Sequence, residues 1–237
     1  MEAVTTQGAL PRSVEEIRAD FPILARQIGG KPVAYLDNAA TAQKPAAVIE
    51  AIDSYYRNSN ANIHRSMHDL AADATALYEG GRERVAELVG VRPGEAVFVR
   101  NATEAINLVR FSWGRRNVGE GDTVLITRME HHSNVVPWQL LCQEQGARLQ
   151  YLEIDDEGRL DLGELEQKLA SGRVKLVAVA HVSNVLGTIN PVAEISARAS
   201  ARGDLRHRVD RAEHVRHVRD AHELHAALRE HRVELIE

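Results

Sequence analysis

Two histidines stand side by side in the segment Met129-Glu-His131-His132-Ser-Asn134, directly after a run of apolar residues. Paired histidines can ligate a metal ion, transfer protons, or stack flat on an aromatic ligand. Adjacent residues in an extended loop point in opposite directions, so a metal ion would use one histidine together with a distant ligand. A histidine in a loop is more often a surface residue than a catalytic one, and the segment by itself leaves these roles open.

Polar residues also follow two other apolar stretches. Arg100-Asn-Ala-Thr103-Glu104 opens a predicted helix, whose free N–H groups and positive dipole end suit a phosphate or a carboxylate, and the threonine hydroxyl adds a donor. The alternative is that this segment only caps the helix. His181-Val-Ser-Asn184-Val-Leu-Gly187-Thr188 places an amide after a very apolar strand, where either a ligand or the backbone has to satisfy it.

Several common signatures of catalysis are absent from the sequence. It contains no GxGxxG, P-loop, GxSxG or HExxH pattern, which argues against a nucleotide-linked dehydrogenase, an NTPase, a serine hydrolase and a zincin. Cys142 is the single cysteine, which excludes an internal disulfide and a thiolate-rich zinc site. A metal-dependent hydrolase built on His64, His68, His131 and His181 has no particular support from their spacing, and we predict no metal site.

Strands and helices alternate along the chain from residue 90 onward. Apolar runs and helical spacing predict strands at 96–99, 123–127, 149–152 and 175–180, and helices at 103–113, 135–145 and 161–170. This alternation implies βαβ units and a mainly parallel sheet that is buried on both faces. Ligands bind at the carboxyl ends of strands in such sheets, so we expect the site in the loops 100–103, 128–134 and 181–187.

The chain before residue 90 is predicted to be largely helical. Ser13-Val-Glu-Glu16 has the pattern of a capping box and predicts a short first helix. A strand is expected at 33–37, and a helix follows Lys44-Pro45. A longer helix is expected at 69–89, although Gly80-Gly81 weakens its middle.

Composition places the chain among globular proteins of one large domain or one and a half. The 237 residues are 44% hydrophobic and 27% charged, with a formal net charge of −5. Neither half has the basic excess that nucleic-acid binding requires, and no apolar run is long enough for a membrane helix. The first residues lack the pattern of a signal peptide, so we expect a soluble cytoplasmic protein with no nucleic-acid or membrane partner.

Five segments, taken in chain order, carry a family resemblance. They are Asp37-Asn-Ala-Ala-Thr-Ala-Gln-Lys-Pro45, Asn62-Ile-His-Arg65, Val97-Phe-Val-Arg-Asn-Ala-Thr-Glu-Ala-Ile-Asn-Leu108, Met129-Glu-His-His-Ser-Asn-Val-Val-Pro-Trp138 and His181-Val-Ser-Asn-Val-Leu-Gly-Thr188. Together they resemble the N-terminal half of Suf-type cysteine desulfurases, which are pyridoxal-phosphate enzymes of the class V aminotransferase group with fold type I. The resemblance implies an α/β large domain with a mostly parallel sheet and helices on both faces, incomplete at its C-terminus.

The resemblance also implies roles for individual residues. Thr103 would hold the phosphate of pyridoxal 5'-phosphate, His131 would stack on its ring as a catalytic residue, and Asn184 would face the ring hydroxyl or the substrate carboxylate. Substrate would contact Ala39, Ala40 and Asn184, and the second predicted catalytic residue is His64. The intact family converts L-cysteine to L-alanine and passes the sulfur to an acceptor protein for iron–sulfur cluster assembly, and it acts as a homodimer.

The resemblance ends after Ile195. The family continues into a segment with the aspartate that pairs with the pyridinium nitrogen and then the Schiff-base lysine, and its later part supplies the sulfur-accepting cysteine. The present chain has four lysines, at positions 31, 44, 168 and 175, and none matches that lysine. Cys142 lies in a predicted helix and is interpreted as a buried apolar residue, so we expect this chain alone to be inactive.

The residues after 195 differ in composition from those before. All nine basic residues of 196–237 are arginine, and six of the eleven histidines lie there. We therefore divide the chain into an N-terminal arm (1–32), a partial large domain (33–195) and an out-of-family tail (196–237), with a frameshifted reading as the hypothesis for the tail. A helical metal site on its histidines is a weaker alternative. For the whole chain, a non-catalytic remnant or a selenocysteine lyase that binds the cofactor weakly remains the alternative function.

Overall fold

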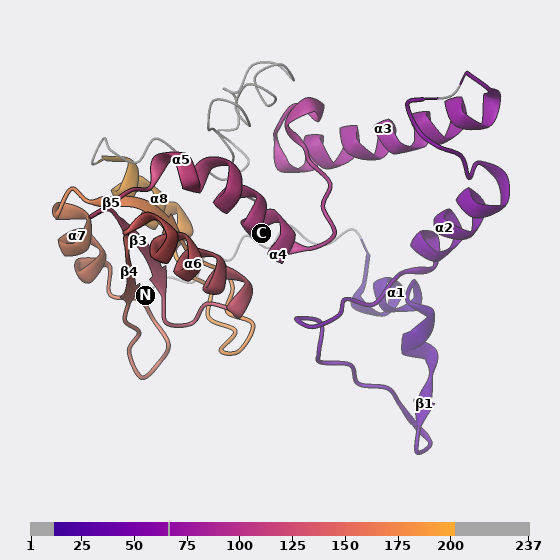
Figure 1. The fold of residues 1–237 in the computed structure, drawn as a ribbon. Helices are drawn as coiled ribbons and strands as arrows, with labels where there is room; N and C mark the ends of the chain where they lie inside the picture. Colours follow the sequence, from indigo (N-terminus) through magenta and orange to yellow (C-terminus); the bar gives the residue numbers. More distant parts are fainter. Residues whose placement is uncertain (1–11, 66, 202–237) are drawn as a thin grey trace. The chain divides into compact units, whose positions relative to one another are not determined.

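A computed structural model describes residues 12–65 and 67–201 of the chain. These residues form two compact units that divide between Gly80 and Gly81, inside one long helix, and each unit is described by itself (Figure 1). The predicted tail falls mostly outside the described residues, including the histidines of the alternative metal site. The last described helix, α8 (Val192–Ala201), runs through position 195 without a break.

The first unit is mainly helical. Its elements are α1 (Val14–Ala19), η1 (Pro22–Ala25), β1 (Gln27–Ile28), β2 (Lys31–Pro32), α2 (Ala46–Asn58) and the start of α3 (Asp69–Val89). The capping box before α1 is confirmed, because the Ser13 hydroxyl accepts from the N–H of Glu16 and the Glu16 carboxylate accepts from the N–H of Ser13. The helices α2 and α3 confirm the helical spacing that the sequence shows.

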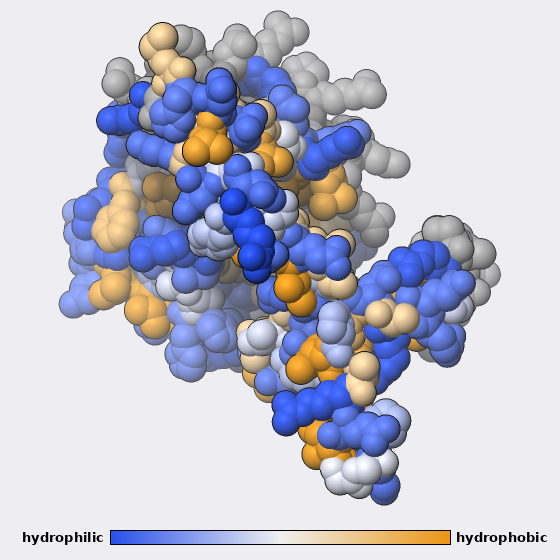
Figure 2. All heavy atoms as spheres, turned by 90° about the vertical axis from the view of Figure 1, so that its right-hand side faces the viewer, coloured by the Kyte–Doolittle hydropathy of each residue, from blue (hydrophilic) through white to orange (hydrophobic). Residues whose placement is uncertain are grey.

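Helix α2 buries none of its side chains. Its apolar residues Val48, Ile49, Ile52 and Tyr56 are all exposed, by 40% to 67%. The space-filling view shows hydrophobic side chains scattered among hydrophilic ones on the face that it presents (Figure 2). A helix gains most of its stability from burying its apolar side, so α2 lacks in this unit the packing that its sequence pattern calls for.

The second unit carries the sheet. Its elements are the rest of α3, η2 (Pro93–Glu95), α4 (Ala102–Val109), a π-helical turn η3 (Arg110–Gly114), α5 (Arg115–Asn117), β3 (Thr123–Thr127), η4 (His132–Asn134), α6 (Val136–Gln145), β4 (Arg148–Leu152), α7 (Leu162–Ala170), β5 (Val174–Ala178) and α8. The three strands are parallel in the order β4-β3-β5, with Leu125 opposite Gln150 and Val177. The predicted parallel sheet is therefore confirmed, with its carboxyl ends on one edge.

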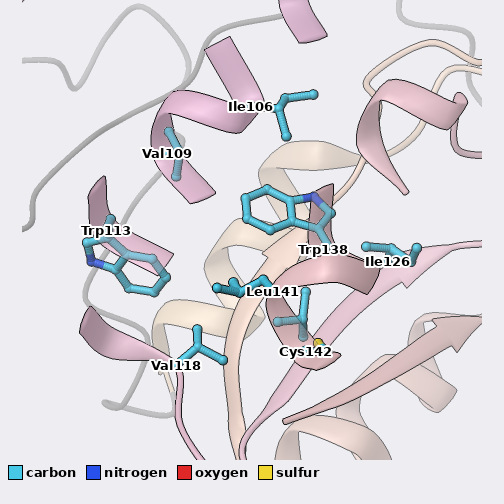
Figure 3. Close-up of a cluster of buried hydrophobic side chains, with 9 residues drawn as sticks. Ile106, Val109, Trp113, Val118, Ile126, Trp138, Leu141 and Cys142 are labelled. Carbon is cyan, nitrogen blue, oxygen red and sulfur yellow. The ribbon is translucent and has the colours of Figure 1, made fainter. Parts of the chain in front are cut away.

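Helices cover both faces of this sheet. On one face α4, η3 and α6 bury Ile106, Trp113, Trp138 and Leu141 against Val124 and Ile126 of β3, as Figure 3 shows for most of this cluster. On the other face α7 and α8 bury Leu165, Leu169 and Ile195 against Leu125 and Leu152. The central strand β3 is buried along its whole length, because side chains that alternate across a strand meet helices on either side.

Two predicted strands are wrong. The segments 33–37 and 96–99 have no strand structure, and Val97 and Phe98 are nearly half exposed. A strand forms only where a neighbouring strand supplies hydrogen bonds, and among the described residues neither segment has such a neighbour. The pairing near the first segment is instead a short hairpin of β1 with β2, whose turn residues Gly29 and Gly30 have φ of +59° and +76°.

The described helices were also compared with the requirements of a membrane span. In residues 12–65 and 67–201, no helix combines the length and the apolar character that crossing a membrane requires. The longest helix, α3, carries charged residues along its whole length.

Candidate functional site

The Glu130 carboxylate joins the ends of two strands at the carboxyl edge of the sheet. It accepts hydrogen bonds from the Thr127 hydroxyl (2.6 Å) at the end of β3 and from the Ala180 N–H (3.0 Å to each oxygen) just after β5. It also accepts from the Asn134 amide (2.8 Å), whose oxygen accepts from the indole N–H of Trp138 (2.8 Å). This network fixes the loop that follows β3 to the segment that follows β5.

His131 lies in the fixed loop and begins the turn η4. Its Nδ1 accepts from the N–H of Ser133 (3.2 Å) and lies 2.9 Å from the Ser133 hydroxyl. Because Nδ1 accepts a backbone hydrogen bond, the neutral ring carries its proton on Nε2. The ring is exposed and meets His132 edge-on, with 6.0 Å between the centroids. An exposed, oriented imidazole at the edge of a parallel sheet is placed to contact a ligand.

Thr103 lies in the first turn of α4, and α4 packs against η4. The helix cap is Asn101, whose side chain accepts from the N–H of Glu104 (2.9 Å), so the cap that the sequence suggested falls on a different residue from Thr103. The Thr103 hydroxyl is exposed and makes no hydrogen bond within the described part of the chain. A free hydroxyl beside the N–H groups of a helix start suits a phosphate.

The same helix start is held by an ion pair. The Glu104 carboxylate accepts from both the backbone N–H (2.7 Å) and the Nε (3.2 Å) of Arg100. The Arg100 guanidinium, together with that backbone bond, lowers the pKa of the Glu104 carboxyl. The pair orders the chain that enters α4. The Asn101 cap occupies the N–H of Glu104, while the N–H groups of Ala102 and Thr103 have no partner among the described residues.

Asn184 lies at the tip of a hairpin-like loop after β5. An isolated bridge between Val182 and Ile189 closes the base of this loop, and the buried Ser183 hydroxyl accepts from the N–H of Leu186 (3.1 Å). Asn184 itself is exposed and has no hydrogen-bond partner among the residues described. The expectation that a ligand or the backbone has to satisfy this amide is therefore wrong, because the exposed side chain is open to solvent and is available to a ligand.

A second asparagine, Asn190, braces the loop from behind. It is 2% exposed, and its amide donates to the carbonyl of Ala180 (2.7 Å) and to the Met129 sulfur (3.3 Å). The loops after β3 and β5 are thus joined by two side chains, the partly buried Glu130 and the buried Asn190.

The remaining predicted site residues belong to the first unit. Ala39 and Ala40 form an exposed turn in which the N–H of Ala40 donates to the carbonyl of Asp37 (3.3 Å). His64 has φ of +64°, and its Nε2 lies 3.1 Å from a carboxylate oxygen of Glu79. A positive φ is unfavourable for a residue with a Cβ, so the backbone at His64 is strained.

In the second unit, Thr103 and His131 lie on contacting elements, and Asn184 lies in the loop that Glu130 joins to the His131 loop through Ala180. Neither lysine of the described second unit, residues 81–201, lies at that edge. Lys175 lies at the beginning of β5, at the opposite edge, and Lys168 forms an ion pair with Glu164 inside α7 (3.2 Å). Residues 12–65 and 67–201 contain no cluster of three or more histidine, cysteine or acidic side chains that could bind a metal ion.

Comparison with known proteins identifies the family. A profile described as "Aminotransferase class-V" matches residues 34–225, most of the chain. The chain belongs to the class-V aminotransferase family. The matched range continues past residue 195, where the resemblance was expected to end, and the division of the chain at that point stays a prediction.

Several relatives of this class-V aminotransferase chain are described as cysteine desulfurases. A cysteine desulfurase from Cronobacter sakazakii is 50% identical over 206 residues, which cover 86% of this chain and 50% of that protein. A probable cysteine desulfurase from Synechocystis is 49% identical over 195 residues, covering 82% and 46%. The solved apo structure of a cysteine desulfurase from Thermococcus onnurineus has a TM-score of 0.74 and 42% identity, covering 81% of this chain and 46% of that one. The chain spans about half the length of the relatives that it matches.

These likenesses confirm the predicted fold class, the α/β large domain of pyridoxal-phosphate enzymes of fold type I. The family uses pyridoxal phosphate, and the residues present fit the non-covalent part of such a site. The helix start with Thr103 fits the phosphate, the oriented His131 ring fits a pyridine ring, and the exposed Asn184 amide fits a polar substituent. The two lysines of the second unit, Lys168 and Lys175, do not fit a covalent anchor.

Sequence reasoning missed the residues that hold the site together. Glu130 and Asn134 lie inside the motif that contains His131, and Asn190 lies just after the motif that contains Asn184. The partner of Glu130, Ala180, is 50 positions away in the sequence, and the partner of Asn190, Met129, is 61 positions away. The sequence held only a partial signal: Glu130 follows the strand β3 closely, where a polar group turned inward needs partners, but nothing in the sequence names them.

Proposed function

We propose that these 237 residues form the phosphate- and ring-binding half of a Suf-type cysteine desulfurase, and that they bind pyridoxal phosphate without a covalent bond. The observation that carries this proposal is the free Thr103 hydroxyl at the start of α4, beside the turn that orients His131. An exposed polar group without a protein partner, at a helix start beside the carboxyl edge of a parallel sheet, is typical of a ligand site.

Each residue has a distinct task in the proposed site. Thr103 and the first N–H groups of α4 hold the phosphate, because the helix dipole favours an anion there. His131 packs on the ring face, and its Nδ1 bond to Ser133 keeps the imidazole in one orientation. Asn184 donates to or accepts from a polar group on the ring or the substrate. Ala39, Ala40 and His64 are proposed for the substrate side.

Turnover is not expected from these residues alone. When bound, pyridoxal phosphate supplies an electron sink, and the protein has to fix its position and protonation. The family's lysine would have to reach the site from the carboxyl edge, whereas Lys175 stands at the other edge and Lys168 is paired within α7. The conversion of L-cysteine, the homodimer, the sulfur-acceptor partner and the cytoplasmic location are proposals for the whole enzyme.

The test is a titration of the purified chain with pyridoxal phosphate, followed by the absorption of the bound cofactor. We expect saturable binding that inorganic phosphate competes away, with weaker binding of pyridoxal, which lacks the phosphate. Thr103→Val should weaken binding about tenfold because a hydrogen bond to a charged group is lost, whereas Thr103→Ser should keep it. Borohydride reduction and peptide mapping should label no single lysine preferentially.

Two results would refute the proposal. Equal affinity for pyridoxal and its phosphate would remove the role of the α4 start. A single labelled lysine together with alanine production from L-cysteine would show that a covalent, active site exists in these residues.

A further inference from the structure

We propose that Glu130 is a positioning residue that sets the spacing between the His131 loop and the Asn184 loop. The inference rests on the proposed function for its consequence, because both loops then face the cofactor. Its geometric part stands independently and is tested independently below.

The contacts of Glu130 come from three segments of the chain. Its carboxylate accepts from Thr127 at the end of β3, from Asn134 in η4, and from the Ala180 N–H after β5. One carboxylate therefore fixes both ends of the His131 loop and the start of the Asn184 loop. In the described residues, the other side-chain bond between these two loops is that of Asn190 to Met129, a weak bond to sulfur.

The network has a fixed direction of hydrogen bonding. Glu130 only accepts, so the Asn134 amide must present its NH₂ to Glu130 and its oxygen to the indole N–H of Trp138. Asn134 is 6% exposed and Trp138 is 1% exposed, so water cannot replace a lost partner easily. The identity of one acceptor thus decides the orientation of the next side chain.

A glutamine at position 130 cannot reproduce the bond to Ala180. Both carboxylate oxygens lie 3.0 Å from the Ala180 nitrogen, so in Glu130→Gln the new NH₂ meets that N–H donor in either orientation of the amide. The Thr127 hydroxyl can accept as well as donate, so the contacts with Thr127 and Asn134 can both be kept by turning the new amide. The substitution therefore weakens the bond that joins the two loops.

A matched variant removes one bond of the same carboxylate without touching the contact between the loops. In Thr127→Val the hydroxyl bond of 2.6 Å is lost, while the carboxylate keeps its bonds to Ala180 and Asn134. An effect of Glu130→Gln that Thr127→Val lacks is therefore specific to the contact with Ala180.

The experiment combines binding with nuclear magnetic resonance on the two variants and the unchanged protein. We expect the dissociation constant for pyridoxal phosphate to rise about tenfold in Glu130→Gln and to stay within about threefold of the original value in Thr127→Val. Without cofactor, the backbone signals of His131 and Asn184 should both shift in Glu130→Gln, whereas the Asn184 signal should keep its position in Thr127→Val. The Trp113 indole serves as an internal reference.

The matched control is Glu157→Gln, which removes a carboxylate from an exposed turn and should change neither measurement. Unchanged His131 and Asn184 signals in Glu130→Gln would overturn the proposal, and so would an equal shift of the Asn184 signal in Thr127→Val. A purely structural role would lower the melting temperature of both variants without a change in affinity that is confined to Glu130→Gln. If the unchanged protein binds no pyridoxal phosphate, the proposed function fails, while the resonance shifts still decide the role of Glu130.

Discussion

The thiol of Cys142 is predicted to be almost unreactive in the folded protein. Cys142 is 5% exposed and packs in the cluster between α6 and the sheet. Burial disfavours the charged thiolate and raises the pKa of Cys142 from 9.0 to about 11. At pH 8 about 0.1% of such thiols are ionised, against about 10% at the ordinary pKa, so alkylation should be about 100-fold slower before steric protection is counted.

The assay is the rate of iodoacetamide addition, followed by intact-protein mass spectrometry. The comparison is the same chain in denaturant, where the thiol regains its ordinary pKa, and Cys142→Ser should show no addition. Because the thiolate is the reacting species, the native rate should rise about tenfold per pH unit from pH 8 to pH 10 without reaching a plateau. In the presence of pyridoxal phosphate and L-cysteine, no sulfur should add to Cys142.

A native rate within tenfold of the denatured rate would refute the reasoning. A plateau below pH 10 would do the same, because it would show an ordinary or lowered pKa. Either result would restore Cys142 as a possible sulfur carrier, since that role requires an accessible thiolate.

Three further predictions concern stability. Gly114→Ala should lower the free energy of unfolding in urea by about 1–3 kcal/mol, because the new Cβ would lie 2.8 Å from a Leu141 methyl carbon. The double variant Gly114→Ala/Leu141→Ala should lose less stability than the sum of the two single changes, and strict additivity would contradict this reasoning. Asn101→Ala should cost about 1 kcal/mol by removing the cap bond to Glu104, while Asn101→Asp should be nearly neutral in the same measurement. His64→Gly should be more stable than His64→Ala by about 1 kcal/mol in thermal unfolding, because φ is +64°, and the reverse order would show that this conformation is not retained.

Much of the fold follows from local patterns in the sequence. Helical spacing predicted α2, α3, α6 and α7 within a few residues, and the apolar runs predicted β3, β4 and β5. The alternation of these elements then gave the parallel sheet and its helices on both faces. These predictions are correct because the spacing of apolar residues along a helix or a strand follows from which of its sides are buried.

The two wrong strands show where this argument stops. Segment 96–99 has the composition of a buried strand, yet the described sheet ends at β4 and β5 and offers it no partner. Strand formation depends on a neighbour that can be far away in the sequence, so residue preference alone cannot establish it. The hairpin of β1 and β2 is different, because Gly29-Gly30 is a local turn signal that could have predicted it.

Some residues of the candidate site could be predicted from local sequence patterns, and others could not. Thr103, His131 and Asn184 could be chosen from the sequence because each follows an apolar run, and two of these runs proved to be parallel strands with a common edge. Glu130 could not be chosen, because its partner Ala180 is 50 positions away and an acidic residue beside a histidine is common in sequences. Its role becomes visible only when the backbone N–H that it accepts from is known.

This difference matters for any interpretation of the motif that contains His131. Taken singly, each polar residue there could be a surface side chain, which is the more frequent outcome for a loop. Yet Glu130 and Asn134 point inward and are bonded to Ala180 and Trp138, while His131 remains exposed and oriented by Ser133. A loop that commits two polar side chains to holding a third in place carries a conformational cost that a plain surface loop does not need. The geometry therefore favours a binding role for His131 more strongly than its residue type does.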